Sequence, residues 1–130
     1  MTNASSCYDI STPAKAVKAL RTHADYMEKL HREMDEINLG ILHAEINGRG
    51  DFAIISPGMS LGYARDYLPK LDQEFNDAIY VLLGLQKCVR ILHDASSQDA
   101  DAYNKMLGRP GISGHERLRL LAGLIEFRCL

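Results

Sequence analysis

The stretch from Leu61 to Leu92 constrains the fold of this chain more than any other part of its sequence. Apolar residues recur along it at steps of three and four without a miss. This spacing puts them all on one face of an α-helix and is typical of a helix that lies along another helix. The members of this seam are Leu61, Ala64, Leu68, Leu71, Phe75, Ala78, Leu82, Leu85, Val89 and Leu92.

We therefore predict a helix over residues 60–94. Ser60 can cap its first turn, and Pro69 should kink it or mark its true start. Residues 79–92 are apolar on almost every side, and a helix of that kind is usually buried on more than one side. We expect this part of the helix to contact more than one neighbour.

A second seam of the same spacing lies earlier in the chain and predicts a helix over residues 13–46. Thr12 can cap this helix, and Pro13 suits its first position, where a missing N–H costs nothing. A short polar lead over residues 1–11 precedes it and is expected to be flexible. The members of this second seam are Ala16, Leu20, His23, Met27, Leu30, Met34, Ile37, Ile41 and Ala44.

Glycines end the first helix and open a loop over residues 47–59. Gly48 and Gly50 lie close together there and favour a left-handed backbone. An alternative interpretation takes residues 41–46 and 52–56 as a β-hairpin across the Asn-Gly turn. We rank it second because the seam continues through Ala44 without slipping.

Two shorter helices are predicted after the long ones. Ser96 and Ser97 open a helix over residues 97–107, which Gly108 and Pro110 close. Ser113 and Glu116 form a capping box that opens a helix over residues 114–128. The predicted fold is all-α, with residues 1–130 as a single helical domain. It is a long, coiled-coil-like antiparallel helical hairpin with two short C-terminal helices.

The predicted lengths favour self-association. A helix over residues 13–46 would be about 50 Å long at ~1.5 Å per residue. A compact chain of 130 residues has a radius of gyration of only about 14 Å. Too little chain remains to wrap both long helices, so we predict that two copies pair as a homodimeric helical bundle.

Composition excludes several classes of partner. The net charge of −2, from 15 basic and 17 acidic residues, does not predict binding to nucleic acid or to an anionic membrane. No apolar run approaches the roughly 20 residues that span a bilayer, and the polar N-terminus has no secretory signal. The three cysteines are widely scattered, so we expect free thiols and a cytoplasmic location.

The sequence has neither a zinc-binding motif nor a motif of a catalytic nucleophile, so we predict no zinc or catalytic site of these kinds. None of the five histidines has a second ligand at zinc-binding spacing. His23 occupies a seam position and is interpreted as a packed or pH-sensitive core residue.

Two pairs of carboxylates are the one cluster with possible chemistry. Glu33 and Glu36 lie on the first long helix, and Glu74 and Asp77 lie on the second. Folding the hairpin about residue 53 brings Glu33 level with Glu74. Four carboxylates at one level could hold Mg²⁺, which prefers such ligands and bridges to substrate phosphates.

At these residues the sequence resembles the MazG-type all-α nucleotide pyrophosphohydrolases. The shared pattern is an E-x-x-E helix, then an E-x-x-D helix that runs into apolar residues 78–83. The resemblance implies Mg²⁺-dependent hydrolysis of a nucleoside triphosphate to a monophosphate and pyrophosphate, in a helical dimer or tetramer. The spacer between the motifs is longer here than in the family, and Arg32 stands where the family commonly has a further glutamate. We favour solvated helix flanks as the role of these charges, and expect no cofactor otherwise.

A small basic cluster near the C-terminus is a weak candidate for anion binding. It consists of Arg109, Arg117 and Arg119. Arg109 precedes a helix N-terminus, which attracts anions. Because the chain is nearly neutral, we favour surface solubility as the role of these arginines.

The favoured function is a non-enzymatic protein-interaction module, such as an adaptor, chaperone or inhibitor. It would bind a protein partner through its helical surfaces and the loop between the long helices. The predicted anchors are Phe52, Ile54, Ile55 and Met59, since an exposed apolar loop usually marks a contact site. The alternative, that this loop folds back onto the fourth helix, stays open at this point.

Overall fold

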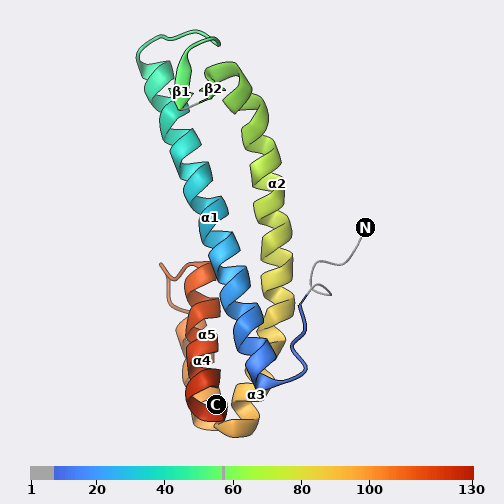
Figure 1. The fold of residues 1–130 in the computed structure, drawn as a ribbon. Helices are drawn as coiled ribbons and strands as arrows, with labels where there is room; N and C mark the ends of the chain where they lie inside the picture. The colour runs from blue at the N-terminus through green and yellow to red at the C-terminus, as the bar shows by residue number, and fades with distance from the viewer. Residues whose placement is uncertain (1–7, 57) are drawn as a thin grey trace. The chain divides into compact units, whose positions relative to one another are not determined.

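The computed structural model describes residues 8–56 and 58–130, and most of these residues are helical (Figure 1). The long helices are α1 (Pro13–Ile46) and α2 (Leu61–Leu85). The shorter helices are α3 (Val89–Ala95), α4 (Ser97–Leu107) and α5 (Gly114–Cys129). A small antiparallel ladder precedes α2, made of β1 (Ile54–Ser56) and β2 (Met59–Ser60). The fold is all-α, as the two seams predict, and most of the predicted N-terminal lead falls on residues 1–7, outside the described residues.

Local capping signals account for where the helices begin. The side-chain oxygens of Thr12 and Ser60 accept N–H groups from the first turns of α1 and α2. Ser96 and Ser113 do the same for α4 and α5, and each such bond satisfies a backbone donor that the helix itself leaves unpaired. At the end of α1, Gly48 has a φ of 65°, a left-handed conformation that glycine adopts without strain. These caps and this stop confirm the local predictions.

The single helix predicted over residues 60–94 is interrupted near its C-terminal end, at residues 86–88. α2 ends at Leu85, a 3₁₀ turn η2 (Gln86–Cys88) follows, and α3 then begins at Val89. The backbone N–H of Val89 is directed at the carbonyl groups of Gln86 and Lys87. The steps of three and four continue unchanged from Leu82 to Leu92, so the seam contains no signal for the change. Because α3 packs against both α4 and α5, tertiary contacts decide the break.

The β-hairpin ranked second from the sequence is also wrong. Residues 41–46 are helical throughout. Ile54 in β1 pairs instead with Ser60 in β2, so a short ladder forms across most of the predicted loop and the residue that caps α2. An Asn-Gly pair therefore acts here as a helix stop rather than as a hairpin turn.

The chain divides into two compact units, to which α1 and α2 both contribute. We call the first the terminal unit, made of the described residues up to Met27 together with Asp77–Leu130. We call the second the loop unit, made of Glu28–Asn76.

In the loop unit, α1 and α2 run antiparallel. His31 and Phe75 have ring centroids 6.1 Å apart. Near the other end of the unit, Glu45 Oε2 lies 3.3 Å from Arg65 Nη2. The predicted hairpin register places Phe75 opposite residue 32, one position from its observed partner.

In the terminal unit, the beginning of α1 lies beside α5 (Figure 1). Arg21 forms an ion pair with Glu126, with 2.8 Å between Nη1 and Oε2, and Asp25 forms one with Arg119 at 2.7 Å. Both long helices and the shorter ones contribute to a single apolar core. Its fully buried large side chains include Leu20, Met27, Leu85, Leu92, Tyr103, Leu118, Leu121 and Ile125.

His23 is a polar side chain inside this core, as its seam position predicts. It is only 2% exposed. Its Nε2 lies 2.8 Å from the carbonyl oxygen of Ala78, and its Nδ1 lies 3.1 Å from the hydroxyl of Tyr8. A carbonyl oxygen can only accept, so Nε2 carries the hydrogen and Nδ1 accepts from Tyr8. Burial lowers the pKa of His23, although the bond to Ala78 opposes that shift.

Candidate partner-binding surface

An apolar groove in the loop unit is the main candidate site. Its cavity is ≈ 670 Å³ in volume. Leu39, Leu42 and Ile46 line it from α1, and Ile54 and Ile55 line it from β1. Leu39, Leu42, Ile46 and Ile54 are all exposed, and Ile46 reaches 75%. We call this surface the α1–β1 groove.

The helical period of α1 explains why these leucines face outward. Leu39, Leu42 and Ile46 recur at steps of three and four, so they share one face of the helix. The seam residues of the same stretch, Ile37 and Ala44, are buried. α1 therefore has two apolar faces here, and only one of them is covered within the loop unit.

Gly40 allows β1 to lie directly against α1. A Cβ atom at this position would be 3.1 Å from Ile55 Cδ1 and 3.2 Å from Ile55 Cβ, tighter than ordinary van der Waals contact. Glycine, which has no Cβ atom, thus permits this close approach. Ile55 rests on α1 at this point and forms one wall of the groove.

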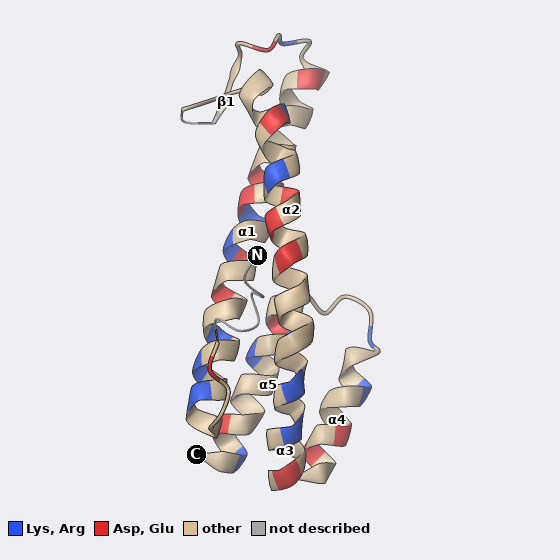
Figure 2. Cartoon of the chain, turned by 90° about the vertical axis from the view of Figure 1, so that its right-hand side faces the viewer, with Lys and Arg blue, Asp and Glu red and all other residues tan. Residues whose placement is uncertain are grey.

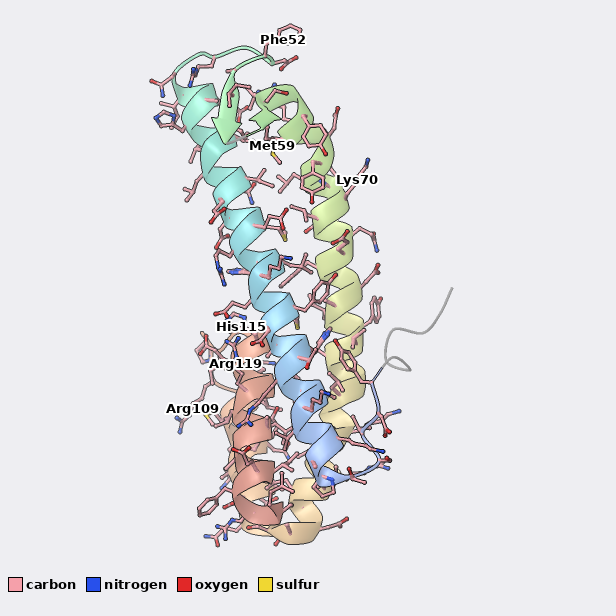
Figure 3. All side chains as sticks on the ribbon, viewed as in Figure 1. Phe52, Met59, Lys70, Arg109, His115 and Arg119 are labelled. Carbon is pink, nitrogen blue, oxygen red and sulfur yellow. The ribbon has the colours of Figure 1, made fainter. Side chains whose placement is uncertain are left out.

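The structure separates the four predicted anchors into two kinds. Phe52 is 95% exposed and points away from the helices (Figure 3), and Ile54 is also exposed. Ile55 and Met59 are half-buried in β1 and β2. Phe52 and Ile54 are therefore available to a partner, whereas Ile55 and Met59 support the backbone that presents them.

Backbone hydrogen bonds hold the turn that carries Phe52. The N–H of Gly62 donates to the carbonyl of Asp51 at 2.9 Å, and the N–H of Leu61 donates to the carbonyl of Ala53 at 2.8 Å. The residues on both sides of Phe52 are thus tied to the first turn of α2. Phe52 projects from a turn that is fixed at both ends.

Arg65 adds a charged clamp that the sequence did not reveal. Its Nη1 donates to Asp51 Oδ1 at 2.8 Å, and its Nη2 donates to Glu45 Oε2 at 3.3 Å. One guanidinium thus joins the end of α1, the turn before Phe52 and the start of α2. All three side chains are exposed, so each pair contributes only about 0–1 kcal/mol. The sequence indicated these contacts only through the opposite charges of the residues. Many other pairs of residues in this chain also have opposite charges, so the contacts could not be singled out.

The loop unit contains three of the four carboxylates of the predicted Mg²⁺ site: Glu33, Glu36 and Glu74. The hydroxyl of Tyr67 donates to Glu33 Oε1 at 3.1 Å. Partial desolvation, this hydrogen bond and the charges of Glu33 and Glu74 raise the pKa of Tyr67. Glu33 is thus the glutamate in contact with this phenol, the charge of Glu74 also acts on it, and Glu36 lines the α1–β1 groove.

The described residues do not form a metal-binding group. Across residues 8–56 and 58–130, no three His, Cys, Asp or Glu side chains are grouped so that they could hold a metal ion. Asp77 belongs to the terminal unit. Figure 2 shows acidic and basic residues interspersed along α1, the distribution of a solvated helix flank. We derive no magnesium chemistry from these carboxylates, and the hydrolase resemblance stays a prediction.

The three predicted anion-binding arginines have different surroundings in the terminal unit. Arg109 is exposed between α4 and α5, and Arg119 projects from α5 (Figure 3). Arg119 is paired with Asp25. Arg117 Nη2 donates to the carbonyl of Leu107 at 3.4 Å. Two of these guanidinium groups thus already have acceptors within the unit.

No protein-family model, curated protein or solved structure matches this chain. Within the part of the chain that the structure describes, no helix is both long enough and apolar enough to cross a membrane. The α1–β1 groove is therefore interpreted from its own geometry.

Proposed function

We propose that this chain is a non-enzymatic protein-interaction module that works as a homodimer in the cytoplasm. It acts as an adaptor, chaperone or inhibitor by binding a protein partner at the α1–β1 groove. The observation that carries the proposal is the uncovered apolar face of α1, formed by Leu39, Leu42 and Ile46. Burying each of these side chains fully against a partner would contribute up to about 1.5–3 kcal/mol.

The shape of the groove fits an amphipathic helix of the partner. A helix presents side chains at steps of three and four, matching the steps of Leu39, Leu42 and Ile46. Phe52 and Ile54 supply an aromatic and a β-branched anchor from the neighbouring loop, and aromatic residues are frequent hot spots. The occupant is therefore an apolar helical segment rather than an extended polar peptide.

Two charged residues give the groove a direction. Glu36 precedes Leu39, Arg49 follows Ile46, and both line the groove. A partner helix with a basic residue at one end of its apolar stripe and an acidic residue at the other would be complementary to this arrangement. Such a partner is expected to bind in one orientation.

The homodimer is supported by apolar surface elsewhere in the chain. Tyr80 and Leu83 of α2 are exposed in the terminal unit, although residues 79–92 were expected to be buried on more than one side. A second copy would complete that burial. The cytoplasmic location is supported by the free thiols of Cys88 and Cys129, which suit a reducing compartment.

Quantitative affinity capture from cells that naturally express the chain tests the groove. A partner enriched by the wild-type chain should be recovered at least ~10-fold less with Ile46→Ser combined with Ile54→Ser, because each removed anchor is worth on the order of 1 kcal/mol or more. Phe127→Ser is the matched control, since Phe127 is an exposed apolar residue (76%) of the terminal unit. Equal recovery of the partner with the wild type, the double variant and the control variant would exclude the groove as the binding site.

A Mg²⁺-dependent nucleoside triphosphate pyrophosphohydrolase is the second candidate. The observation that favours it is that Glu33 accepts a hydrogen bond from Tyr67 and that the charge of Glu74 acts on the same phenol. Incubation with Mg²⁺ and a panel of nucleoside triphosphates tests it directly. Pyrophosphate release that is lost in Glu74→Ala, with unchanged circular dichroism, would favour the enzyme, whereas no release from the wild type would remove it.

A further inference from the structure

α2 carries a second, uncovered apolar stripe within the terminal unit. Tyr80 is 75% exposed and Leu83 is 58% exposed, and Ile79 beside them is partly exposed. Ile79 and Leu83 are four residues apart and Tyr80 and Leu83 are three apart, so the three share one helix face. We call Ile79, Tyr80 and Leu83 the α2 stripe.

The α2 stripe lies on the side of the helix opposite the core. At 100° per residue, its centre falls about half a turn from the centre of the buried set. The buried residues of the same helical turns are Ala78, Val81, Leu82 and Leu85. A helix on the surface of a soluble domain normally presents polar residues on the side away from its core. This part of α2 is thus built to be covered on two opposite sides.

The charges that flank the α2 stripe have opposite signs at its two ends. Asp77 precedes the stripe, and Lys87 and Arg90 follow it; all three are exposed. Asp77 lies four to five residues before the midpoint between Tyr80 and Leu83, and Lys87, in the 3₁₀ turn η2, lies five to six residues after it. Two copies of this segment placed antiparallel therefore bring Asp77 of each copy near Lys87 of the other.

We propose that the α2 stripe is the interface between two copies of this chain, which pack antiparallel about a two-fold axis between Tyr80 and Leu83. Tyr80 of each copy contacts Leu83 of the other. The proposal rests on the homodimer of the proposed function and names the surface that forms it.

The sign pattern selects a second copy over another protein. An isologous interface must be complementary to itself, because the same surface of each copy forms both of its sides. A stripe with acid at one end and base at the other meets this requirement in the antiparallel orientation, and a parallel pairing would place like charges together. The α1–β1 groove belongs to the loop unit and shares no residue with the α2 stripe.

Sedimentation equilibrium over a micromolar concentration range tests the interface. Leu83→Lys should weaken dimerisation by about 100-fold or more, because the two-fold axis doubles the loss of a buried anchor. Phe127→Lys, at an even more exposed apolar position on α5, should leave it unchanged. Circular dichroism monitors the fold of each variant, and both positions are exposed enough for the fold to persist.

A pair of opposite charges tests the orientation. Tyr80→Asp alone and Leu83→Lys alone should each give a monomer, while the double variant should regain the dimer, since each new acid then meets a new base on the other copy. A double variant that stays monomeric would overturn the antiparallel register.

The remaining outcomes separate this inference from the proposed function. A wild-type chain that is monomeric at every concentration would overturn both the homodimer and the α2 stripe as its interface. A wild-type dimer that survives Leu83→Lys would overturn the α2 stripe alone and leave the homodimer standing. Loss of dimerisation in Leu83→Lys with unchanged partner capture supports the stripe and leaves the α1–β1 groove to its own test.

Discussion

The terminal unit and the loop unit share one sequence pattern but bury it to different degrees. In the terminal unit, the seam positions of α1 and of the end of α2 are buried, including Leu20 and Leu85. In the loop unit, Met34, Ile41 and Leu68 occupy equivalent positions and are only half-buried. A heptad pattern thus predicts which side of a helix faces its partner, but not how completely that side is sealed.

The difference follows from what covers the long helices in each unit. The terminal unit also contains α3, α4 and α5, and their side chains close its core. The loop unit has only the small β1–β2 ladder as an additional element. Two helices and a short ladder bury less apolar surface than five packed elements, so the loop unit keeps an open apolar groove.

The largest expected effect comes from removing a core side chain of the terminal unit. Leu121→Ala should lower the free energy of unfolding by about 2–5 kcal/mol, because Leu121 is fully buried and a cavity would remain. Leu68→Ala in the loop unit should cost no more than about half as much, since Leu68 is half-buried. Urea denaturation measures both, and equal losses would contradict the difference between the units.

Two glycines of α5 test how tightly the terminal unit is packed around this helix. A Cβ at Gly114 would lie 2.8 Å from Leu82 Cδ1 and 3.1 Å from Met27 Cε; both atoms end flexible side chains that can shift, so Gly114→Ala should destabilise the chain by only about 1 kcal/mol through overpacking. Gly123, on the same helix, has nothing within 4 Å of such an atom, so Gly123→Ala should stabilise by about 0.5–1 kcal/mol. Thermal or urea unfolding measures the change in stability for each variant. If both substitutions stabilised the chain, α5 would pack less tightly than described.

Acid should weaken the terminal unit through His23. Burial lowers the pKa of His23 in the folded chain, so below about pH 6.5 the unfolded chain takes up a proton that the folded chain resists. Stability should therefore fall as the pH drops from 6.5 towards the lowered folded pKa, by at most about 1.4 kcal/mol per pH unit. Above pH 6.5 this contribution is fully present.

Urea midpoints at pH 7.5 and pH 5.5 measure this effect. His23→Leu should reduce the difference between the two midpoints, although it also removes the bonds to Ala78 and Tyr8. His31→Gln is the control, because His31 is an exposed residue of the loop unit. An unchanged pH difference in His23→Leu would show that another group is responsible.

The smallest effect is expected at the clamp of the loop unit. Arg65→Ala removes the contacts with Asp51 and Glu45 and should change the free energy of unfolding by only about 0–1 kcal/mol, because all three groups are exposed. Hydrogen exchange should nevertheless become faster at the Gly62 amide, whose bond to Asp51 holds the turn. Unaltered exchange would mean that the backbone bonds hold Phe52 in place by themselves.

Local signals in the sequence predicted most of the helical framework. The range 13–46 and the observed α1 coincide, because a proline start, an uninterrupted seam and a glycine stop all agree. The capping box at Ser113 likewise marked the start of α5. These features act within a few residues of each other, so sequence reasoning could find them.

The candidate surface was only partly predictable. The sequence predicts Phe52 and Ile54 as anchors because they are apolar residues in a loop, but it makes no prediction for Leu39 and Leu42, which lie outside the seam. Their exposure depends on what lies over α1 in the folded chain. Nothing in their spacing distinguishes an uncovered second stripe from one that a neighbouring element buries.

The all-α class, the caps and the faces that the long helices turn towards each other could be read from the residues alone, since these depend on helical period and on hydrogen bonds within one turn. The 3₁₀ turn after α2, the contact of β1 with Gly40 and the apolar faces that stay open became visible only in the folded chain. Those outcomes depend on contacts between residues far apart in the chain, and the free energy of such contacts is set by packing geometry rather than by residue type.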